Sequence, residues 1–241
     1  MTDAHKLLSP VEHGADSPSS EPARITHAIE DYLKAAFRLS AEGGSVTTQR
    51  MAEELGISGP AVTNMVKRLH ELRLVEHTRY HGIALTDAGK RIALEVVRHH
   101  RLLELYLAES LGYQWDQVHA EAEKLEHHVS DELEARMDSA LGFPTVDPHG
   151  DPIPSREGLL AEVPELRLTD IEPGERATVR RVSDRNPDQL RYLGELGLRP
   201  GTSIAVLEKL PFDGPIRIRV SQVDHVIGLA LASVINVERE G

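Results

Sequence analysis

Two short helix-forming segments separated by a glycine-bearing turn constrain the fold of this chain more than any other feature. The first, residues 48–55, carries apolar residues at helical spacing and stops at Gly56. Ser58 then offers an N-cap, and Pro60 a first-turn proline, for a second segment over residues 61–72. Two short helices joined in this way predict a helix-turn-helix.

The segments on either side extend this motif. Helical spacing predicts one helix from about residue 24 up to a Gly-Gly pair, and two long helices over about 87–111 and 116–140. Alternation over residues 74–86 predicts a hairpin with a basic tip, placed where a wing would follow the second short helix. Five β-patterned runs separated by turn signals predict a small barrel beyond residue 169. These runs are residues 177–182, 203–207, 216–220, 226–231 and 234–238.

Charge is unevenly distributed along the chain. The formal net charge of the 241 residues is −12, which by itself argues against a nucleic-acid partner. Residues 102–170 hold sixteen acidic and four basic residues, whereas residues 61–101 hold eight Lys or Arg against four acids. Because salt screens charges beyond about 10 Å, a locally basic segment can still bind phosphate groups.

The composition also limits the possible metal ligands and the compartment. The chain has no cysteine, which excludes disulfides and thiolate ligands and leaves His, Asp, Glu and carbonyl donors. It has no apolar run of about 18 residues and no recognisable export signal. We therefore expect a cytoplasmic protein with no membrane partner.

The second short helix is the candidate DNA-reading element. In a helix-turn-helix the first turn of this helix meets base edges in the major groove, and basic side chains contact phosphates. The candidate base readers are Ser58, Pro60, Ala61, Thr63 and Asn64, and the candidate phosphate contacts are Lys67, Arg68 and Arg79. The alternative is a helix-turn-helix that serves as a protein-interaction module.

One reading helix covers only a half-site, so we expect a homodimer on a palindromic operator in double-stranded DNA. Apolar residues lie on more than one side of the predicted helix 87–111. This pattern favours a helix that packs a partner, with a fully buried core helix as the alternative.

The run His-Ala-Glu-Ala-Glu-Lys-Leu-Glu-His is the candidate metal site. On one continuous helix, four of its side chains would fall within roughly 100° of one another and present nitrogen and carboxylate donors. These four are His119, Glu123, Glu126 and His127. The alternative is a solvated helix face, but an apolar stripe runs directly beside the donors and favours the edge of a packed interface. His128 points away from them and is expected to be an ordinary surface histidine.

Further stretches of sequence join this run in matching one known family. They are Ile29-Glu30-Asp31-Tyr32-Leu33, Ser58-Gly59-Pro60, Leu85-Thr86-Asp87-Ala88-Gly89, His100-Arg101-Leu102-Leu103-Glu104 and Ser130-Asp131-Glu132. With them the chain resembles, over residues 23–241, the diphtheria-toxin-repressor family of metal-dependent transcription regulators. The resemblance implies a mainly α fold with a small β domain, in which the barrel is SH3-like, or FeoA-like.

The resemblance also implies two metal sites and a division into domains. The primary, activating site would fall on Asp31, Glu123, Glu126 and His127. The ancillary site would fall on His100, Glu104 and His119, with Gln189 as the best candidate from the carboxyl-terminal domain. The expected segments are a disordered arm (1–22), a winged helix-turn-helix domain (23–86), a helical metal-binding and dimerisation domain (87–141), a linker (142–168) and an SH3-like domain (169–241).

Two positions bear on the identity of the metal. The iron-responsive members resemble one another in having Cys at position 123, whereas this chain has Glu, as the manganese-responsive members do. Some manganese members have a second carboxylate one turn after the first-helix ligand, but here that position is Lys34, which argues against a two-manganese cluster built on that carboxylate. The choice of metal therefore rests on Glu123. We therefore predict Mn²⁺ as the cofactor, with Fe²⁺ as the alternative and Zn²⁺, Co²⁺, Ni²⁺ or Cd²⁺ as substitutes in vitro.

The expected function is a transcriptional regulator, with repression of metal-uptake genes the usual role in the family. We expect neither an enzyme nor a small organic substrate. One alternative is a metallohydrolase or a carboxylate-bridged metal oxidase, although the chain lacks His-Glu-x-x-His and paired Glu-x-x-His motifs. The other is a winged-helix regulator of small molecules whose His/Glu face is structural.

Overall fold

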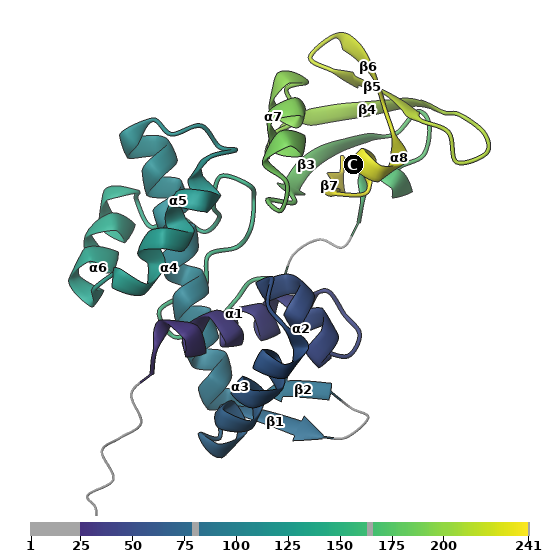
Figure 1. Ribbon diagram of the computed structural model, residues 1–241. Helices are drawn as coiled ribbons and strands as arrows, with labels where there is room; N and C mark the ends of the chain where they lie inside the picture. Colours follow the sequence, from purple (N-terminus) through teal and green to yellow (C-terminus); the bar gives the residue numbers. More distant parts are fainter. Residues whose placement is uncertain (1–24, 79–81, 163–165, 241) are drawn as a thin grey trace, which may run out of the picture.

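The computed structural model describes residues 25–78, 82–162 and 166–240. Figure 1 shows three successive units: three helices with a two-stranded hairpin, a helical group around the long helix α4, and a five-stranded sheet. The predicted arm lies outside the described residues, and so does Arg79 at the tip of the predicted hairpin. None of the described helices is long and apolar enough to cross a membrane.

The elements have the following bounds. The helices are α1 (His27–Ala41), α2 (Thr48–Leu55), α3 (Gly59–Glu71), α4 (Asp87–Leu111), α5 (Val118–Leu125), α6 (Asp131–Ala140), α7 (Pro187–Glu195) and α8 (Leu229–Ala232). The strands are β1 (Val75–Thr78), β2 (Gly82–Leu85), β3 (Arg176–Val182), β4 (Ser203–Lys209), β5 (Ile216–Val220), β6 (Val223–Ile227) and β7 (Ile235–Arg239).

The amino-terminal unit is the expected helix-turn-helix with a hairpin. The Thr47 side chain caps α2 by accepting a hydrogen bond from the Arg50 N–H, and Gly56 ends α2 with a left-handed φ of 65°. Pro60 lies in the first turn of α3. Buried side chains of α1, α2, α3 and the hairpin form one core, so α1 is part of the reading unit.

The single helix expected over residues 116–140 is wrong, because the segment forms two helices. α5 ends at Leu125, and Glu126–His128 form a 3-10 turn. Ser130 then starts α6, since its side chain accepts a hydrogen bond from the Leu133 N–H. A serine that caps a new helix competes with continuation of the old one. The last two donors of the His/Glu run therefore leave the helix that carries the first two.

Helix α4 is buried on both of its apolar sides within a single chain. Its apolar residues therefore do not indicate a dimer, contrary to our expectation. Six of these side chains were expected to divide between the core and a partner. They are Leu94, Val96, Val97, Leu102, Leu103 and Leu105, and none is more than 8% exposed. The apolar sides of α4 are therefore covered within one chain, as in our alternative, while Lys90, Arg91 and Glu95 of the same helix are exposed. Dimerisation needs separate evidence.

The segment 142–168 does more than link two domains. Val146 forms a β-bridge with Pro152, and Asp147 in the turn between them is buried. Ile153 joins the core of the α4–α6 unit. Its proline and glycine content correctly indicated the lack of a long helix, but it gave no sign that the segment packs against α4.

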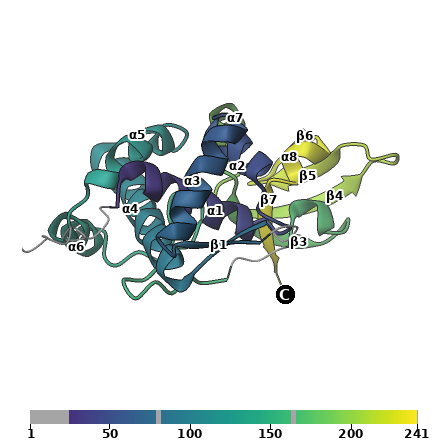
Figure 2. The same cartoon turned by 60° about the horizontal axis from the view of Figure 1, so that its bottom comes forward.

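The carboxyl-terminal sheet is antiparallel, with strand order β6-β5-β4-β3-β7. The strand expected over residues 226–231 is wrong in its second half, where α8 forms instead. A short apolar run does not distinguish a strand from a helical turn. Trp115, which follows α4, is buried in the core of this sheet. Arg185 pairs with Glu42 and Glu54 of the amino-terminal unit, so the sheet contacts both helical units (Figure 2).

Candidate metal centre

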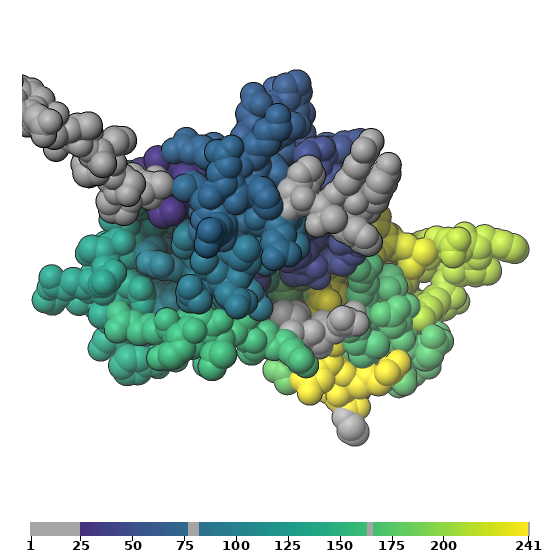
Figure 3. Space-filling model, turned by 90° about the horizontal axis from the view of Figure 1, so that it is seen from below, coloured from purple at the N-terminus to yellow at the C-terminus, as the bar shows by residue number. Residues whose placement is uncertain are grey.

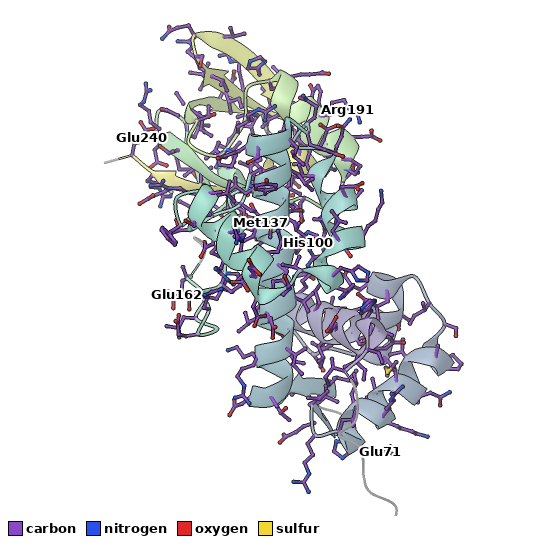
Figure 4. All side chains as sticks on the ribbon, turned by 90° about the vertical axis from the view of Figure 1, so that its left-hand side faces the viewer. Glu71, His100, Met137, Glu162, Arg191 and Glu240 are labelled. Carbon is purple, nitrogen blue, oxygen red and sulfur yellow. The ribbon has the colours of Figure 1, made fainter. Side chains whose placement is uncertain are left out.

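Donor side chains from four parts of the chain meet near the middle of the molecule. Figure 4 shows His100 close to the midpoint between Glu71, at the end of α3, and Arg191, on α7. Around it the described residues form overlapping sets of nitrogen and carboxylate donors. One set, which we call the ancillary group, is His100, Glu104, His119 and Asp184. Of the predicted site that we call the primary group (Asp31, Glu123, Glu126 and His127), Asp31, Glu126 and His127 lie together, whereas Glu123 forms a set with Glu126 and His100.

The ancillary group is compact, with ligand atoms that all lie within 4.8 Å of one another. His100 Nε2 is 2.9 Å from Glu104 Oε1 and 3.1 Å from His119 Nδ1. His119 Nδ1 is also 3.3 Å from Asp184 Oδ2. Two donors from α4, one from α5 and one from the segment after β3 therefore converge on one point.

The charges of His119 and Asp184 in the ancillary group stabilise each other. Burial disfavours the imidazolium, but hydrogen bonds with Asp184 and Glu104 raise the pKa of His119 to about 9. Burial likewise opposes ionisation of Asp184, yet its hydrogen bond with His119 and the nearby Arg38 hold its pKa well below the usual range. In the metal-free protein, His119 is therefore a cation between carboxylates at neutral pH.

The charge on His119 should stabilise the metal-free fold over a defined pH range. Its folded pKa of about 9 exceeds the ordinary value of 6.5, so its contribution is complete below pH 6.5 and is lost as the pH rises through about 9. We expect the free energy of unfolding in chelator to fall over this range, and to fall less in His119→Gln. Urea denaturation at several pH values measures it. His128→Gln is the control, since His128 is exposed; equal losses in wild type and His119→Gln would contradict the prediction.

The primary group joins the reading unit to the turn after α5. His127 Nε2 lies 2.8 Å from Asp31 Oδ1 and 3.5 Å from Glu126 Oε1. The other ring nitrogen of His127 is 2.6 Å from Glu30 Oε2, which fixes the orientation of the imidazole. Asp31, Glu123 and His127 line one pocket of about 370 Å³.

Lys34 lies among these carboxylates. Its Nζ is 2.6 Å from Glu123 Oε1, 2.7 Å from Glu126 Oε2 and 3.3 Å from His100 Nδ1. The lysine side chain is 5% exposed and that of Glu126 is fully buried. Burial alone would raise the pKa of Glu126, but the hydrogen bond with His100 and the charge of Lys34 hold it below its usual range. Lys34 thus acts as the internal counter-ion of the primary group.

His100 connects the two groups. Its Nδ1 is 2.5 Å from Glu126 Oε2, and its Nε2 faces Glu104 and His119. The ring is 2% exposed. The two groups are therefore linked through this imidazole and also through Arg38, whose guanidinium nitrogens lie 3.9 Å from Glu123 Oε1 and from Asp184 Oδ2.

The donors present fit a divalent metal ion. Each group combines imidazole nitrogen with carboxylate oxygen, and neither contains a thiolate. Such sets suit Mn²⁺, Fe²⁺ and Zn²⁺. Several carboxylates from distant parts of the chain are held close together, an arrangement that a cation stabilises.

Comparison with known proteins agrees with this interpretation. Residues 24–83 match the family described as "Iron dependent repressor, N-terminal DNA binding domain". Residues 86–155 match "Iron dependent repressor, metal binding and dimerisation domain", and residues 166–239 match "FeoA domain". The iron-dependent repressor IdeR of Mycobacterium leprae is 31% identical over 230 residues, which cover 89% of this chain and 98% of that protein.

The chain belongs to the iron-dependent repressor family.

The diphtheria toxin repressor of Corynebacterium diphtheriae is likewise 31% identical, over 89% of this chain and 98% of its own length. Among solved structures, a manganese-dependent transcriptional repressor in complex with manganese is similar with a TM-score of 0.82 and 39% identity, over 88% of this chain and all of that one. ScaR with bound Cd²⁺ is similar with a TM-score of 0.76 and 35% identity, over 88% and 99%.

As a member of this repressor family, the chain is a metal-dependent, DNA-binding transcriptional repressor and not an enzyme. Its matched domains include one for DNA binding and one for dimerisation, which imply DNA and a second copy of the chain as partners. The helical and β architecture is the expected one, with an amino-terminal DNA-binding domain, a helical metal-binding and dimerisation domain and a FeoA domain.

The candidate DNA-contacting residues lie on the accessible side of α3 in this repressor. The exposed set comprises Ser58, Pro60, Ala61, Thr63, Asn64, Lys67 and Arg68. Figure 3 looks onto this end of the molecule, where α2 and α3 (blue) lie at the surface. Exposure of all seven leaves our proposed reading face free to enter a groove.

The sequence alone did not reveal two contributors to the centre. Asp184 supplies the carboxylate from the carboxyl-terminal domain, two residues beyond the buried Val182, and strand alternation could have drawn attention to it. Our own candidate from that domain was Gln189, whose backbone N–H binds Asn186 Oδ1 in the first turn of α7. Glu30 was also missed as the partner of His127.

Proposed function

We propose that this repressor responds to Mn²⁺ and controls metal-uptake genes as a homodimer on a palindromic operator. The observation that supports Mn²⁺ is the primary group, in which Glu123 supplies a carboxylate and every donor is oxygen or nitrogen. Structures similar to this chain include manganese regulators. The second candidate is Fe²⁺, favoured by the likeness to IdeR repressors.

The proposed switch fixes the reading unit relative to α4. Asp31 belongs to α1, which shares one core with α2, α3 and the hairpin. His127 belongs to the turn after α5, whose Glu126 carbonyl oxygen is 3.3 Å from His99 Nδ1 on α4. When bound, a divalent cation supplies the positive charge that the facing carboxylates share. Asp31 and His127 then hold the two units in one orientation.

Thermodynamic linkage between metal binding and DNA binding determines how strongly metal can raise operator affinity. If the DNA-competent arrangement holds metal more tightly, operator DNA must raise metal affinity by the same factor that metal raises operator affinity. Coupling of about 1 to 3 kcal/mol corresponds to a change of roughly 5- to 150-fold. The primary group supports coupling because its donors come from both units.

Lys34 stabilises the metal-free state of the proposed switch. In the metal-free protein its ammonium group neutralises Glu123 and Glu126 and holds α1 near the end of α5. A divalent ion bound to the same carboxylates would repel this ammonium at short distance. We infer that Lys34 leaves the carboxylates when the ion binds, which moves α1 and the reading unit with it.

The test of the proposed function is operator binding with different metals. Operator fragments are selected from random DNA by the Mn²⁺-loaded protein, and their affinity is measured by anisotropy with chelator, Mn²⁺, Fe²⁺ under anaerobic conditions, or Zn²⁺. We expect Mn²⁺ to raise affinity at least fivefold at free concentrations where Fe²⁺ does not. Equal activation at matched free Fe²⁺ would favour the second candidate, and no activation by any metal would reject the proposal.

Replacing Glu123 by cysteine should change the metal response. A thiolate favours softer ions, so the concentrations of Fe²⁺ and Zn²⁺ needed for half-maximal operator binding should fall about tenfold relative to that of Mn²⁺. Operator anisotropy against buffered free metal gives these values. Glu132→Cys is the matched control, because Glu132 lies on the exposed face of α6. An unchanged order of metals in Glu123→Cys would count against the assignment of this position.

A further inference from the structure

The segment between β3 and α7 reaches both helical units of the molecule. Its Asp184 belongs to the metal centre, with Oδ2 3.3 Å from His119 Nδ1 on α5. The next residue, Arg185, pairs with Glu42, the C-cap of α1, and lies 3.4 Å from Glu54 on α2. Two adjacent residues of the carboxyl-terminal domain therefore contact the metal centre and the reading unit.

The carboxyl-terminal domain is fixed to the α4–α6 unit by buried contacts. Trp115, which follows α4, is 5% exposed and lies in the core of the sheet. The Arg199 guanidinium lies over its ring, 4.5 Å from the centroid, and a Cβ at Gly194 would lie 2.9 Å from its Nε1. The Val182 N–H donates to the His149 carbonyl oxygen over 2.9 Å. Because a buried aromatic side chain contributes much of the energy of such a contact, the sheet and the α4–α6 unit form one frame.

The contacts between this frame's sheet and the reading unit are of a different kind. Within the described residues, the ion pairs between them come from two arginines, Arg185 and Arg38. The side chains of Arg185, Glu42 and Glu54 are 53%, 39% and 20% exposed. The apolar cores of the sheet and of the reading unit share no residue. Exposed ion pairs contribute little to stability, so the reading unit can leave the sheet without opening a core.

Glu42 and Glu54 together fix the position of the whole reading unit. Arg50 Nη2 is 3.3 Å from Glu42 Oε2, and the same guanidinium donates to the carbonyl oxygens of Gly43 and Ser45 over 3.1 Å. Glu42 is thus attached to the connection between α1 and α2, and Glu54 lies on α2 itself. Because α3 shares a core with both helices, a contact that holds α1 and α2 also holds the reading helix.

These contacts belong to the metal-free arrangement. Arg38, on α1, lies 3.9 Å from both Glu123 and Asp184, one carboxylate from each metal group. A divalent ion bound to these carboxylates would repel the guanidinium, as it would repel Lys34. Both cations belong to α1, so metal binding displaces α1 from the frame and withdraws Glu42 from Arg185.

We propose that Arg185, paired with Glu42 and Glu54, is an autoinhibitory latch that holds the reading unit in its metal-free position. This inference rests on the metal-dependent operator binding proposed above. Mn²⁺ opens the latch by displacing α1, and the carboxyl-terminal domain opposes operator binding until it does. The latch acts through charge on the surface, whereas the metal groups act through buried ligands.

Operator affinity in chelator tests the latch on the full-length protein. Arg185→Ala should raise the metal-free affinity about two- to fivefold, the range expected for exposed ion pairs, and leave the affinity at saturating Mn²⁺ unchanged. Arg180→Ala is the matched control, because Arg180 is 50% exposed but pairs with Glu238 inside the sheet. An unchanged or lower metal-free affinity in Arg185→Ala would overturn the proposal.

A charge exchange tests whether the pairing itself matters. Arg185→Glu places a third carboxylate beside Glu42 and Glu54, and Glu54→Arg restores an opposite charge. Wild type, the two single variants and the double variant form a double-mutant cycle in metal-free operator affinity. We expect the double variant to return toward wild type by more than the sum of the single changes predicts. Additive changes would overturn the latch.

The position of the reading unit can also be measured without DNA. The chain has no cysteine, so Gln49→Cys and Glu195→Cys, both at exposed positions, allow a pair of dyes to be attached. In chelator, Arg185→Ala should shift energy transfer between the dyes away from its wild-type value, and Arg180→Ala should not. Identical transfer in wild type and Arg185→Ala would overturn the proposal. These measurements need no metal, so failure of the latch is distinguishable from failure of the proposed function, which a wild type unresponsive to Mn²⁺ would show.

Discussion

Replacing Lys34 by methionine should destabilise the metal-free protein by about 3 kcal/mol, since removing one partner of a buried ion pair leaves charge without its counter-ion. Lys34 Nζ lies 2.6 Å from Glu123 and 2.7 Å from Glu126, and the Glu126 side chain has no solvent contact. Mn²⁺ can supply the missing charge, so its affinity should rise about tenfold, which corresponds to about 1.4 kcal/mol. Urea denaturation with chelator and calorimetric titration with Mn²⁺ measure the two effects.

The matched control for this change is Lys124→Met. Lys124 also pairs with a glutamate, Glu121, but its side chain is 66% exposed, so its removal should leave the free energy of unfolding nearly unchanged. If Lys34→Met and Lys124→Met have the same small effect, Lys34 is not the internal counter-ion. If Lys34→Met is destabilised but gains no Mn²⁺ affinity, the lysine does not compete with metal.

Asp31→Ala should abolish the stimulation of operator binding by Mn²⁺ while leaving a folded protein. Asp31 is the donor of the primary group that belongs to the reading unit, and it lies 2.8 Å from His127. Without it, metal can still bind Glu126 and His127 but no longer connects them to α1. The 5- to 150-fold gain in operator affinity expected for wild type should therefore fall to about onefold. Anisotropy of labelled operator with Mn²⁺ or chelator measures this gain.

Asp131→Ala provides the control, because Asp131 is exposed in the first turn of α6. It should retain the full response to Mn²⁺. Circular dichroism and the metal-free affinity for DNA establish that Asp31→Ala is folded. A normal Mn²⁺ response in folded Asp31→Ala would reject the proposed switch.

Local signals in the sequence were sufficient to predict the helices and turns of the amino-terminal unit. Gly56 and Pro60 each act on their own stretch of backbone, so their effect does not depend on the rest of the fold. Ser58 occupies the N-cap position of α3, but its side chain makes no capping hydrogen bond. The break between α5 and α6 was missed because Ser130 can cap a helix or continue one, and only packing decides which. The apolar sides of α4 were misassigned for the same reason, since periodicity reports burial but not whether the covering surface belongs to the same chain.

The site was predictable where ligands share an element and less so where they come from different domains. His100 and Glu104 are four residues apart on α4, and helical spacing places them together. Asp184 reaches His119 only because the sheet docks beside α5, which no local pattern encodes. Lys34 was recognised as a departure from the family pattern, but its position inside the carboxylate cluster follows from three-dimensional packing.

The ring of His100 makes the two groups dependent on each other in a specific sense. A neutral imidazole has one lone pair and one N–H, so it can be a ligand on one side only and must be a hydrogen-bond donor on the other. Its Nδ1 faces Glu126 and its Nε2 faces Glu104. If Nε2 binds an ion of the ancillary group, the proton lies on Nδ1 and is donated to Glu126, a member of the primary group. We therefore expect metal binding at one group to change the affinity of the other, so that the binding isotherm does not fit two independent sites.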